Sequence, residues 1–170
     1  MHKRRGYTIV EVTIVIVVIL ILATLSVIYL AKARQKAKLS RVSTELTEIA
    51  TSLSQYAEDN NYQYPADTNR SVPPGLERYL QGGTWPVSQW PTGVFDWDNW
   101  TINGAKVYQI SYRLCDIDDP ISACSDPVLF PNFVRNSSIF YCISGACVPH
   151  ESSPTVPGYC VNCNPKERNY

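Results

Sequence analysis

Residues 7–31 read YTIVEVTIVIVVILILATLSVIYLA, an almost wholly apolar run whose one charged side chain is Glu11. About 20 consecutive apolar residues are enough for a helix to cross a bilayer, so the run predicts a transmembrane helix. The apolar part of a cleaved secretory signal is usually shorter, about 7–15 residues, and ends at a small-residue cleavage site. The length of this run and the basic residues that follow it therefore favour a retained membrane helix.

The helix is expected to continue beyond the membrane, because no glycine or proline occurs between Gly6 and Pro65. The turn-forming run that starts at Asp59 is expected to end it. Its apolar residues recur every three or four positions, which predicts one buried stripe: Leu39, Val42, Leu46, Ile49, Leu53 and Tyr56, widened by Ala50 and Ala57. The opposite, solvent-facing side is expected to carry Lys38, Arg41, Glu45, Glu48, Gln55 and Glu58.

Beyond Pro65 the pattern changes to strands and loops. Residues 107–114 and 137–144 alternate between apolar and polar side chains, as half-buried strands do. Residues 128–134 are a weaker strand candidate because Pro131 interrupts them. Residues 73–80 are expected to form a short helix and residues 82–100 a loop-rich connection. The predicted fold class is α+β, with a long N-terminal helix whose second half packs on a small, mostly antiparallel sheet.

Charge divides the chain in two. Residues 1–41 hold a single acid, Glu11, and eight basic residues: Lys3, Arg4, Arg5, Lys32, Arg34, Lys36, Lys38 and Arg41. Residues 42–170 hold seven basic and 14 acidic residues, so nucleic-acid binding through the bulk surface is not expected. The positive-inside rule, with three basic residues before the apolar run and five after it, would place the N-terminus outside. We instead place the N-terminus in the cytoplasm, because the distal cysteines suit an oxidising compartment.

Six cysteines lie in the distal part, and their even number predicts disulfides. Cys115 and Cys124 close a short loop and are a plausible pair, whereas the other four allow several connectivities. Their C-x4-C and C-x2-C spacing also resembles a four-thiolate zinc site, and the last pair matches a C-x-x-C redox motif. Disulfides are favoured over both in an oxidising compartment. These four cysteines are Cys142, Cys147, Cys160 and Cys163.

Two further clusters have a functional and a structural interpretation. Acidic residues of the 116–126 loop could bind calcium, although their spacing matches no EF-hand and a solvated loop is favoured. Four tryptophans could form an adhesive or sugar-binding surface, although packing in the core is favoured: Trp85, Trp90, Trp97 and Trp100. Neither histidine forms a catalytic set with a serine or cysteine. The sequence therefore predicts no enzyme, no resident metal and no cofactor.

The N-terminus resembles the type IV pilin and type II secretion pseudopilin family. The resemblance rests on KRRG at residues 3–6, YTIVE at 7–11 and the apolar helix that follows. It implies cleavage between Gly6 and Tyr7 by a prepilin peptidase and methylation of the new amino terminus at Tyr7. Tyrosine replaces the more usual phenylalanine at this position. The implied division is a leader (1–6), a transmembrane and assembly segment (7–31), an amphipathic helix half (32–59) and a disulfide-containing globular domain (60–170).

The resemblance also implies a role for the single membrane acid. A charged group within a bilayer is costly and usually functional, and we predict that Glu11 pairs with the Tyr7 amine of a neighbouring subunit during assembly. The alternatives are that Glu11 is solvated among the headgroups or pairs with its own amine. The basic residues 32–41 are expected to contact anionic headgroups, acidic patches of neighbours, or solvent alone.

The function that the resemblance implies is a structural subunit of a type IV pilus. Its expected partners are copies of itself, the peptidase, the assembly platform and motor proteins, and membrane lipid before assembly. Its expected location is the cell membrane, as a single-pass protein, and then an extracellular pilus or a periplasmic pseudopilus. The alternatives are a pseudopilin of a type II secretion system and a monomeric, membrane-anchored binding protein.

Overall fold

One helix and a four-stranded sheet make up the regular structure of the computed structural model, which describes residues 8–115 and 126–163. The side chains of residues 25–28 are not among those described. The chain divides into two compact units at the bond between Ala37 and Lys38. The helix α1 (Ile9–Asp59) contributes its first part to one unit and its second part to the other.

The helix α1 ends where the sequence predicts, at Asp59. Within residues 38–59 the predicted apolar stripe is buried: Val42, Leu46 and Leu53 are completely inaccessible to solvent. The residues after the helix turn the chain sharply, because Asn61 and Tyr62 both adopt left-handed backbone angles, with φ of 56° and 61°. A hydrogen bond from the Tyr62 amide to the Ala57 carbonyl closes this turn at 2.7 Å.

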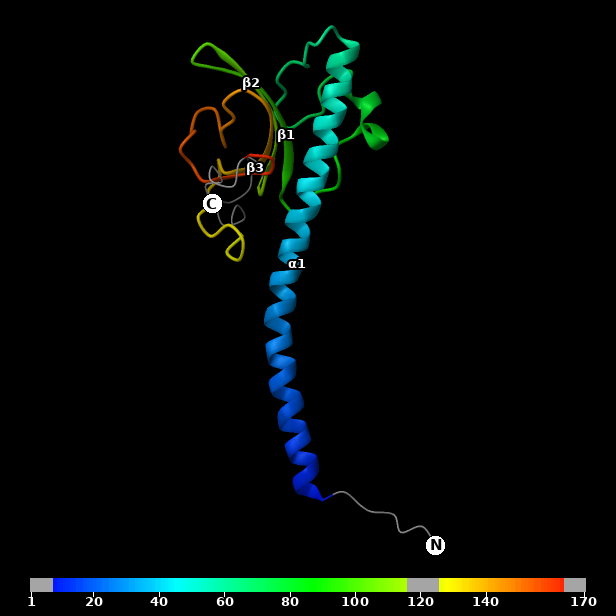
Figure 1. The fold of residues 1–170 in the computed structure, drawn as a ribbon, viewed down its shortest axis with the longest axis vertical. Coiled ribbons are helices and arrows are strands. Elements are labelled where there is room, and N and C mark those ends of the chain that lie inside the picture. Colours follow the sequence, from blue (N-terminus) through cyan, green and yellow to red (C-terminus); the bar gives the residue numbers. More distant parts are fainter. Residues whose placement is uncertain (1–7, 116–125, 164–170) are drawn as a thin grey trace. The chain divides into compact units, whose positions relative to one another are not determined.

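The sheet has the order β1-β2-β3-β4 and lies beside the second half of α1 (Figure 1). Its strands are β1 (Val94–Ile102), β2 (Ala105–Arg113), β3 (Ser138–Ser144) and β4 (Gly158–Cys160). The first three are antiparallel, and β3 pairs with β4 in parallel. The sheet is therefore mixed, and the α+β architecture predicted from the sequence is confirmed.

The strand β1 corrects the prediction that residues 82–100 form only a loop-rich connection. Its aspartates and asparagine are rare in strands, and this composition hides the alternation. The turn into β2 is Asn103–Gly104, with φ of 50° and 80°, and Asn-Gly is the residue pair most typical of a two-residue hairpin. The Asn-Gly dipeptide is the sequence signal that could have predicted a strand directly before residue 103.

The other predicted elements of this region differ in detail. Residues 73–80 contain the short 3-10 helix η1 (Leu76–Tyr79), and a second 3-10 turn, η2 (Gln81–Gly83), follows it. Residues 128–134 form turns, with an isolated bridge between Asp126 and Phe130 in place of a strand. Pro131, which lacks a backbone donor, explains why this segment does not join the sheet.

The main core lies between the sheet and residues 39–57 of α1. The inner face of the sheet contributes aromatic and aliphatic side chains at alternating strand positions. These belong to the same core cluster as the helix stripe, and so does Leu114, which directly follows β2. The strand residues are Phe95, Trp97, Ile110, Tyr112 and Ile139. Trp97 is fully buried, and its indole Nε1 donates to the Pro65 carbonyl at 3.1 Å. This core fixes the position of the loops that carry the disulfides.

The outer face of the sheet carries a buried polar network. Arg113 Nε lies 3.2 Å from Asp96 Oδ2, and Arg113 Nη2 lies 3.9 Å from Asp98 Oδ1. Gln109 Nε2 donates to Asp98 Oδ2 at 2.9 Å and to the Val148 carbonyl at 2.9 Å. Burial, followed by the charge of Asp96, raises the pKa of Asp98 to about 8.

Glu45 is an exception to the predicted solvent-facing side of α1, because it is only 7% exposed. Its Oε1 accepts from Arg41 Nε at 3.0 Å and from Gln89 Nε2 at 3.2 Å. The loop that contains Gln89 covers this carboxylate, and helical periodicity contains no information about such a loop. The prediction that Glu45 faces solvent is therefore wrong.

Candidate functional site

The start of α1 is built by a reciprocal pair of side chains. Glu11 Oε2 accepts from the Thr8 backbone N–H at 2.8 Å and from the Thr8 hydroxyl at 2.9 Å. The Glu11 N–H in turn donates to Thr8 Oγ1 at 3.3 Å. This is a capping box, in which the residue before the helix and the third helical residue satisfy each other's free backbone donors.

The role of Thr8 was not predicted from the sequence, although the signal is present. The residues TIVE at 8–11 match the S/T-x-x-E pattern of a capping box. The match means that Glu11 has a local structural role in addition to the predicted pairing with an amine. Its two Thr8 contacts use Oε2, and Oε1 receives no hydrogen bond within residues 8–115 and 126–163.

The apolar surface of the first unit is exposed on all sides of the helix. The large side chains from Ile9 to Leu22 are 46–82% exposed. Among the described residues, α1 is the one helix long and apolar enough to cross a membrane. The hydroxyls of Thr13 and Thr24 donate to the carbonyls of Val10 and Ile21, at 2.9 and 2.8 Å. Such internal bonds lower the cost of placing these hydroxyls in lipid or in a protein interface.

The basic residues after the apolar run fall into two groups. Lys38 lies 5.5 Å from the centre of the Trp90 ring, and Arg41 pairs with Glu45. Lys32, Arg34 and Lys36 are exposed and have no ion pair within the described residues. These three residues are therefore the ones in this segment that present uncompensated positive charge.

The described cysteines are all in disulfides. Cys142 pairs with Cys147, and Cys160 pairs with Cys163. These bonds occupy the four thiolates that the zinc interpretation needs. Cys115 is also disulfide-bonded, but its predicted partner Cys124 lies outside the described residues, so that pairing stays a prediction.

The tryptophans do not form a binding surface. Trp90, Trp97 and Trp100 are at most 8% exposed, and Trp85 is half-buried with its Nε1 donating to the Arg70 carbonyl at 3.0 Å. The core interpretation is therefore correct. Part of the predicted calcium loop, residues 116–125, lies outside the described residues.

Asp126, which belongs to the same acidic loop, is buried. Its Oδ1 accepts from the amides of Val128 and Leu129, both at 3.0 Å. Its Oδ2 accepts from Trp90 Nε1 at 3.1 Å. These bonds assign Asp126 a structural role, because they hold the turn after it and fix the orientation of the Trp90 ring.

Gly6 and Tyr7, the predicted cleavage and methylation residues, also lie outside the described residues. The structure begins one residue later, at Thr8, where the capping box fixes the first turn of α1. Of the two residues in the predicted assembly pair, only Glu11 therefore lies among the described residues. Its carboxylate lies on the exposed surface of the helix.

Comparison with known families identifies the N-terminal segment. Residues 1–27 match the family model described as the prokaryotic N-terminal methylation motif. No curated protein and no solved structure matches the chain significantly. The methylation motif, the capped first turn and the exposed apolar helix occupy one continuous segment. The chain therefore carries, at residues 1–27, the signature of type IV pilin and pseudopilin precursors.

Proposed function

We propose that this chain is the precursor of a structural subunit of a type IV pilus. It is inserted in the cell membrane through residues 7–31, cleaved after Gly6, methylated at Tyr7 and polymerised through α1. The observation that carries the proposal is the methylation motif at residues 1–27, continuous with a helix whose apolar side chains are exposed. Packing against copies of itself, or against lipid, is what removes such a surface from water.

The partners in this proposal are of two kinds. Prepilin peptidase acts on the Gly6–Tyr7 bond, and platform and motor proteins supply the work of assembly. Neighbouring copies cover the apolar surface from Ile9 to Leu22, and lipid covers it before assembly. The distal domain, with its disulfides, then faces the extracellular medium.

Processing is tested by the intact mass of the chain recovered from cells. The wild-type chain is expected to lack residues 1–6 and to carry one added methyl group. Gly6→Val is expected to retain the full precursor mass, because a branched side chain replaces the small residue at the cleavage point. Arg5→Ala is the matched control and is expected to be processed. Full precursor mass for the wild-type chain would contradict the proposal.

The role of Glu11 in assembly follows from its two oxygens. Thr8 contacts Oε2, which leaves Oε1 for the positively charged amine that cleavage creates at Tyr7 of a neighbouring copy. In a low-dielectric surrounding such a pair is costly to leave half-formed. We therefore expect the pair to set the axial position of neighbours, whereas the apolar side chains supply most of the adhesion.

Substitution separates the pairing role of Glu11 from its capping role. Glu11→Gln retains a side-chain oxygen for the Thr8 donors but loses the charge, and it is expected to lower filament yield at least about tenfold while membrane insertion persists. Thr8→Val removes the hydroxyl contact and retains the charge, and it is expected to cost about 1 kcal/mol of helix stability with filaments retained. For both variants, electron microscopy measures filament yield and membrane fractionation measures insertion. Normal filament yield for Glu11→Gln would rule out the charge pair.

The second candidate function is a pseudopilin of a type II secretion system, because the methylation motif occurs in both classes. Surface filaments that disappear on deletion favour the pilus. Loss of protein secretion on deletion, with no surface filaments in the wild type, favours the pseudopilin. The monomeric binding protein loses its main argument, because the tryptophans that it would use are buried or half-buried.

A further inference from the structure

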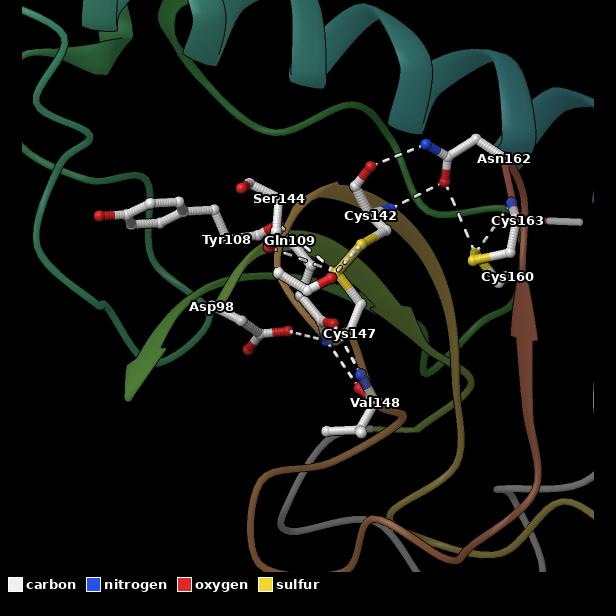
Figure 2. The surroundings of a disulfide bond; sticks show 11 residues. Asp98, Tyr108, Gln109, Cys142, Ser144, Cys147, Val148, Cys160, Asn162 and Cys163 are labelled. Carbon is white, nitrogen blue, oxygen red and sulfur yellow. Dashed lines mark hydrogen bonds between the residues drawn. A yellow bond between two sulfur atoms is a disulfide. The ribbon is translucent and has the colours of Figure 1, made fainter. Parts of the chain in front are cut away.

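Two disulfides lie next to each other at the edge of the sheet, joined by Asn162 (Figure 2). Asn162 Nδ2 donates to the Cys142 carbonyl at 2.7 Å, and Asn162 Oδ1 accepts from the Cys142 amide at 2.9 Å. The side-chain amide thus replaces the backbone hydrogen bonds that would otherwise continue the pairing between β3 and the chain after β4. The Cys160–Cys163 disulfide closes the turn that holds Asn162 there.

The two residues of the Cys160–Cys163 disulfide differ in exposure. Cys160 ends β4 and is 2% exposed, whereas Cys163 is partly exposed. An external thiolate must reach one sulfur in line with the sulfur–sulfur bond, so access decides which sulfur is attacked. Attack at Cys163 makes Cys160 the leaving group.

The structure also favours negative charge on Cys160 when it leaves. The Cys163 backbone N–H donates to Cys160 Sγ at 3.1 Å, and a donor aimed at sulfur stabilises a thiolate. Burial of Cys160 acts in the opposite direction. Asn162 Oδ1, 3.5 Å from the same sulfur, also acts in the opposite direction, but the Cys163 N–H is the closer group, at 3.1 Å.

The neighbouring disulfide has the opposite surroundings. Its sulfurs have contacts with carbonyl oxygens: Gly145 O lies 3.5 Å from Cys142 Sγ, and Ser144 O and Tyr108 O lie 3.7 and 3.8 Å from Cys147 Sγ. A carbonyl oxygen repels a thiolate and favours the protonated thiol. Either sulfur of Cys142–Cys147 is therefore a poor leaving group, although both cysteines are partly exposed.

We propose that Cys160–Cys163 is a thiol–disulfide exchange site that reacts with an external dithiol, whereas Cys142–Cys147 is structural. The external thiolate forms a bond to Cys163 Sγ, the Cys160–Cys163 bond breaks, and the electron pair passes to Cys160, which takes up a proton from water. The second thiol of the reductant then attacks the reductant's first sulfur, which is bonded to Cys163 in the mixed disulfide. This step oxidises the dithiol to a disulfide and releases Cys163 as a thiolate, so the chain ends with two reduced cysteines. Because the disulfide no longer closes the turn that holds Asn162, the hydrogen bonds between Asn162 and Cys142 are weakened.

The test is differential alkylation of the full-length folded chain in detergent. Dithiothreitol is added in steps, free thiols are trapped, and the labelled cysteines are mapped by mass spectrometry. Cys160 and Cys163 are expected to be labelled about fivefold or more faster than Cys142 and Cys147. With reduced glutathione in excess and an acid quench, the mixed disulfide is expected at Cys163. Faster labelling of Cys142 and Cys147, equal rates, or glutathione on Cys160 would overturn the proposal.

Paired double variants keep the test independent of folding losses. Cys142→Ser with Cys147→Ser leaves the proposed exchange site intact, and it is expected to show the wild-type labelling rate at Cys160 and Cys163. Cys160→Ser with Cys163→Ser is the matched control, and its remaining Cys142–Cys147 bond is expected to stay slow. A fast Cys142–Cys147 bond in this control would also contradict the assignment. If either double variant does not fold, the wild-type labelling order alone decides the result.

Discussion

Asp98→Asn is expected to stabilise the domain at pH 8 and to remove part of its pH dependence. Asp98 is buried in the outer network of the sheet, and its pKa is raised to about 8, by burial first and by the charge of Asp96 second. The same carboxyl group has a pKa near 3.9 in an unfolded chain. Between about pH 4 and pH 8 the native chain therefore holds one more proton at this position than the unfolded chain.

The sign of the effect follows from that extra proton. The free energy of unfolding falls as pH rises through this window, by up to about 1.4 kcal/mol for each pH unit. An asparagine keeps an acceptor for Gln109 Nε2 and never ionises, so it does not incur this loss. Asp98→Asn is therefore expected to be more stable than the wild-type chain at pH 8, by an amount that shrinks as pH falls toward 5.

Urea unfolding at pH 5 and pH 8, followed by tryptophan fluorescence, measures the difference. The wild-type chain is expected to be less stable at pH 8 than at pH 5, and the variant to show a smaller difference. Glu151→Gln is the control, because Glu151 is an exposed carboxylate, and it is expected to leave the wild-type pH dependence unchanged. Equal destabilisation of Asp98→Asn at both pH values would mean that Asp98 is ionised and paired with Arg113.

Leu46→Ala is expected to lower the free energy of unfolding of residues 38–163 by about 2–5 kcal/mol. Leu46 is completely buried in the core cluster that joins α1 to the sheet. Truncation removes apolar contacts and leaves a cavity that the helix and the aromatic residues facing it cannot close completely. The large range reflects how far such a site can relax.

Thr47→Ala is the matched control for this prediction. Thr47 is the next residue of the same helix, and it is exposed with its hydroxyl bonded to the Ser43 carbonyl at 2.9 Å. It is expected to change stability by less than about 0.5 kcal/mol, as surface substitutions usually do. Chemical denaturation of both variants at one pH provides the comparison. Similar stabilities for the two variants would mean that α1 does not pack on the sheet through this stripe.

The sequence identified the elements whose signals are local. The absence of glycine and proline, and the spacing of Leu46, Ile49 and Leu53, predicted a helix that ends at Asp59 and the face that it buries. Period-two alternation predicted β2 and β3 within two residues of their observed bounds. These signals are readable because helix and strand periodicity depend on residues that are near one another in the chain.

Long-range contacts decided what the sequence predictions missed or left open. Glu45 is buried by a loop 44 residues away, and β1 tolerates Asp96 and Asp98 because Arg113 and Gln109 of β2 compensate them. The pairing of the last four cysteines depends on the turn after β3 and on the position of β4.

By itself the sequence determined the methylation motif, the apolar helix and its single acid, because these are properties of one continuous segment. Only the tertiary structure decided that the tryptophans form core and that the Asn162 side chain bonds the backbone of Cys142. Sequence spacing could not supply these facts. Burial and hydrogen-bond direction at a side chain are set by segments that approach it from elsewhere in the chain.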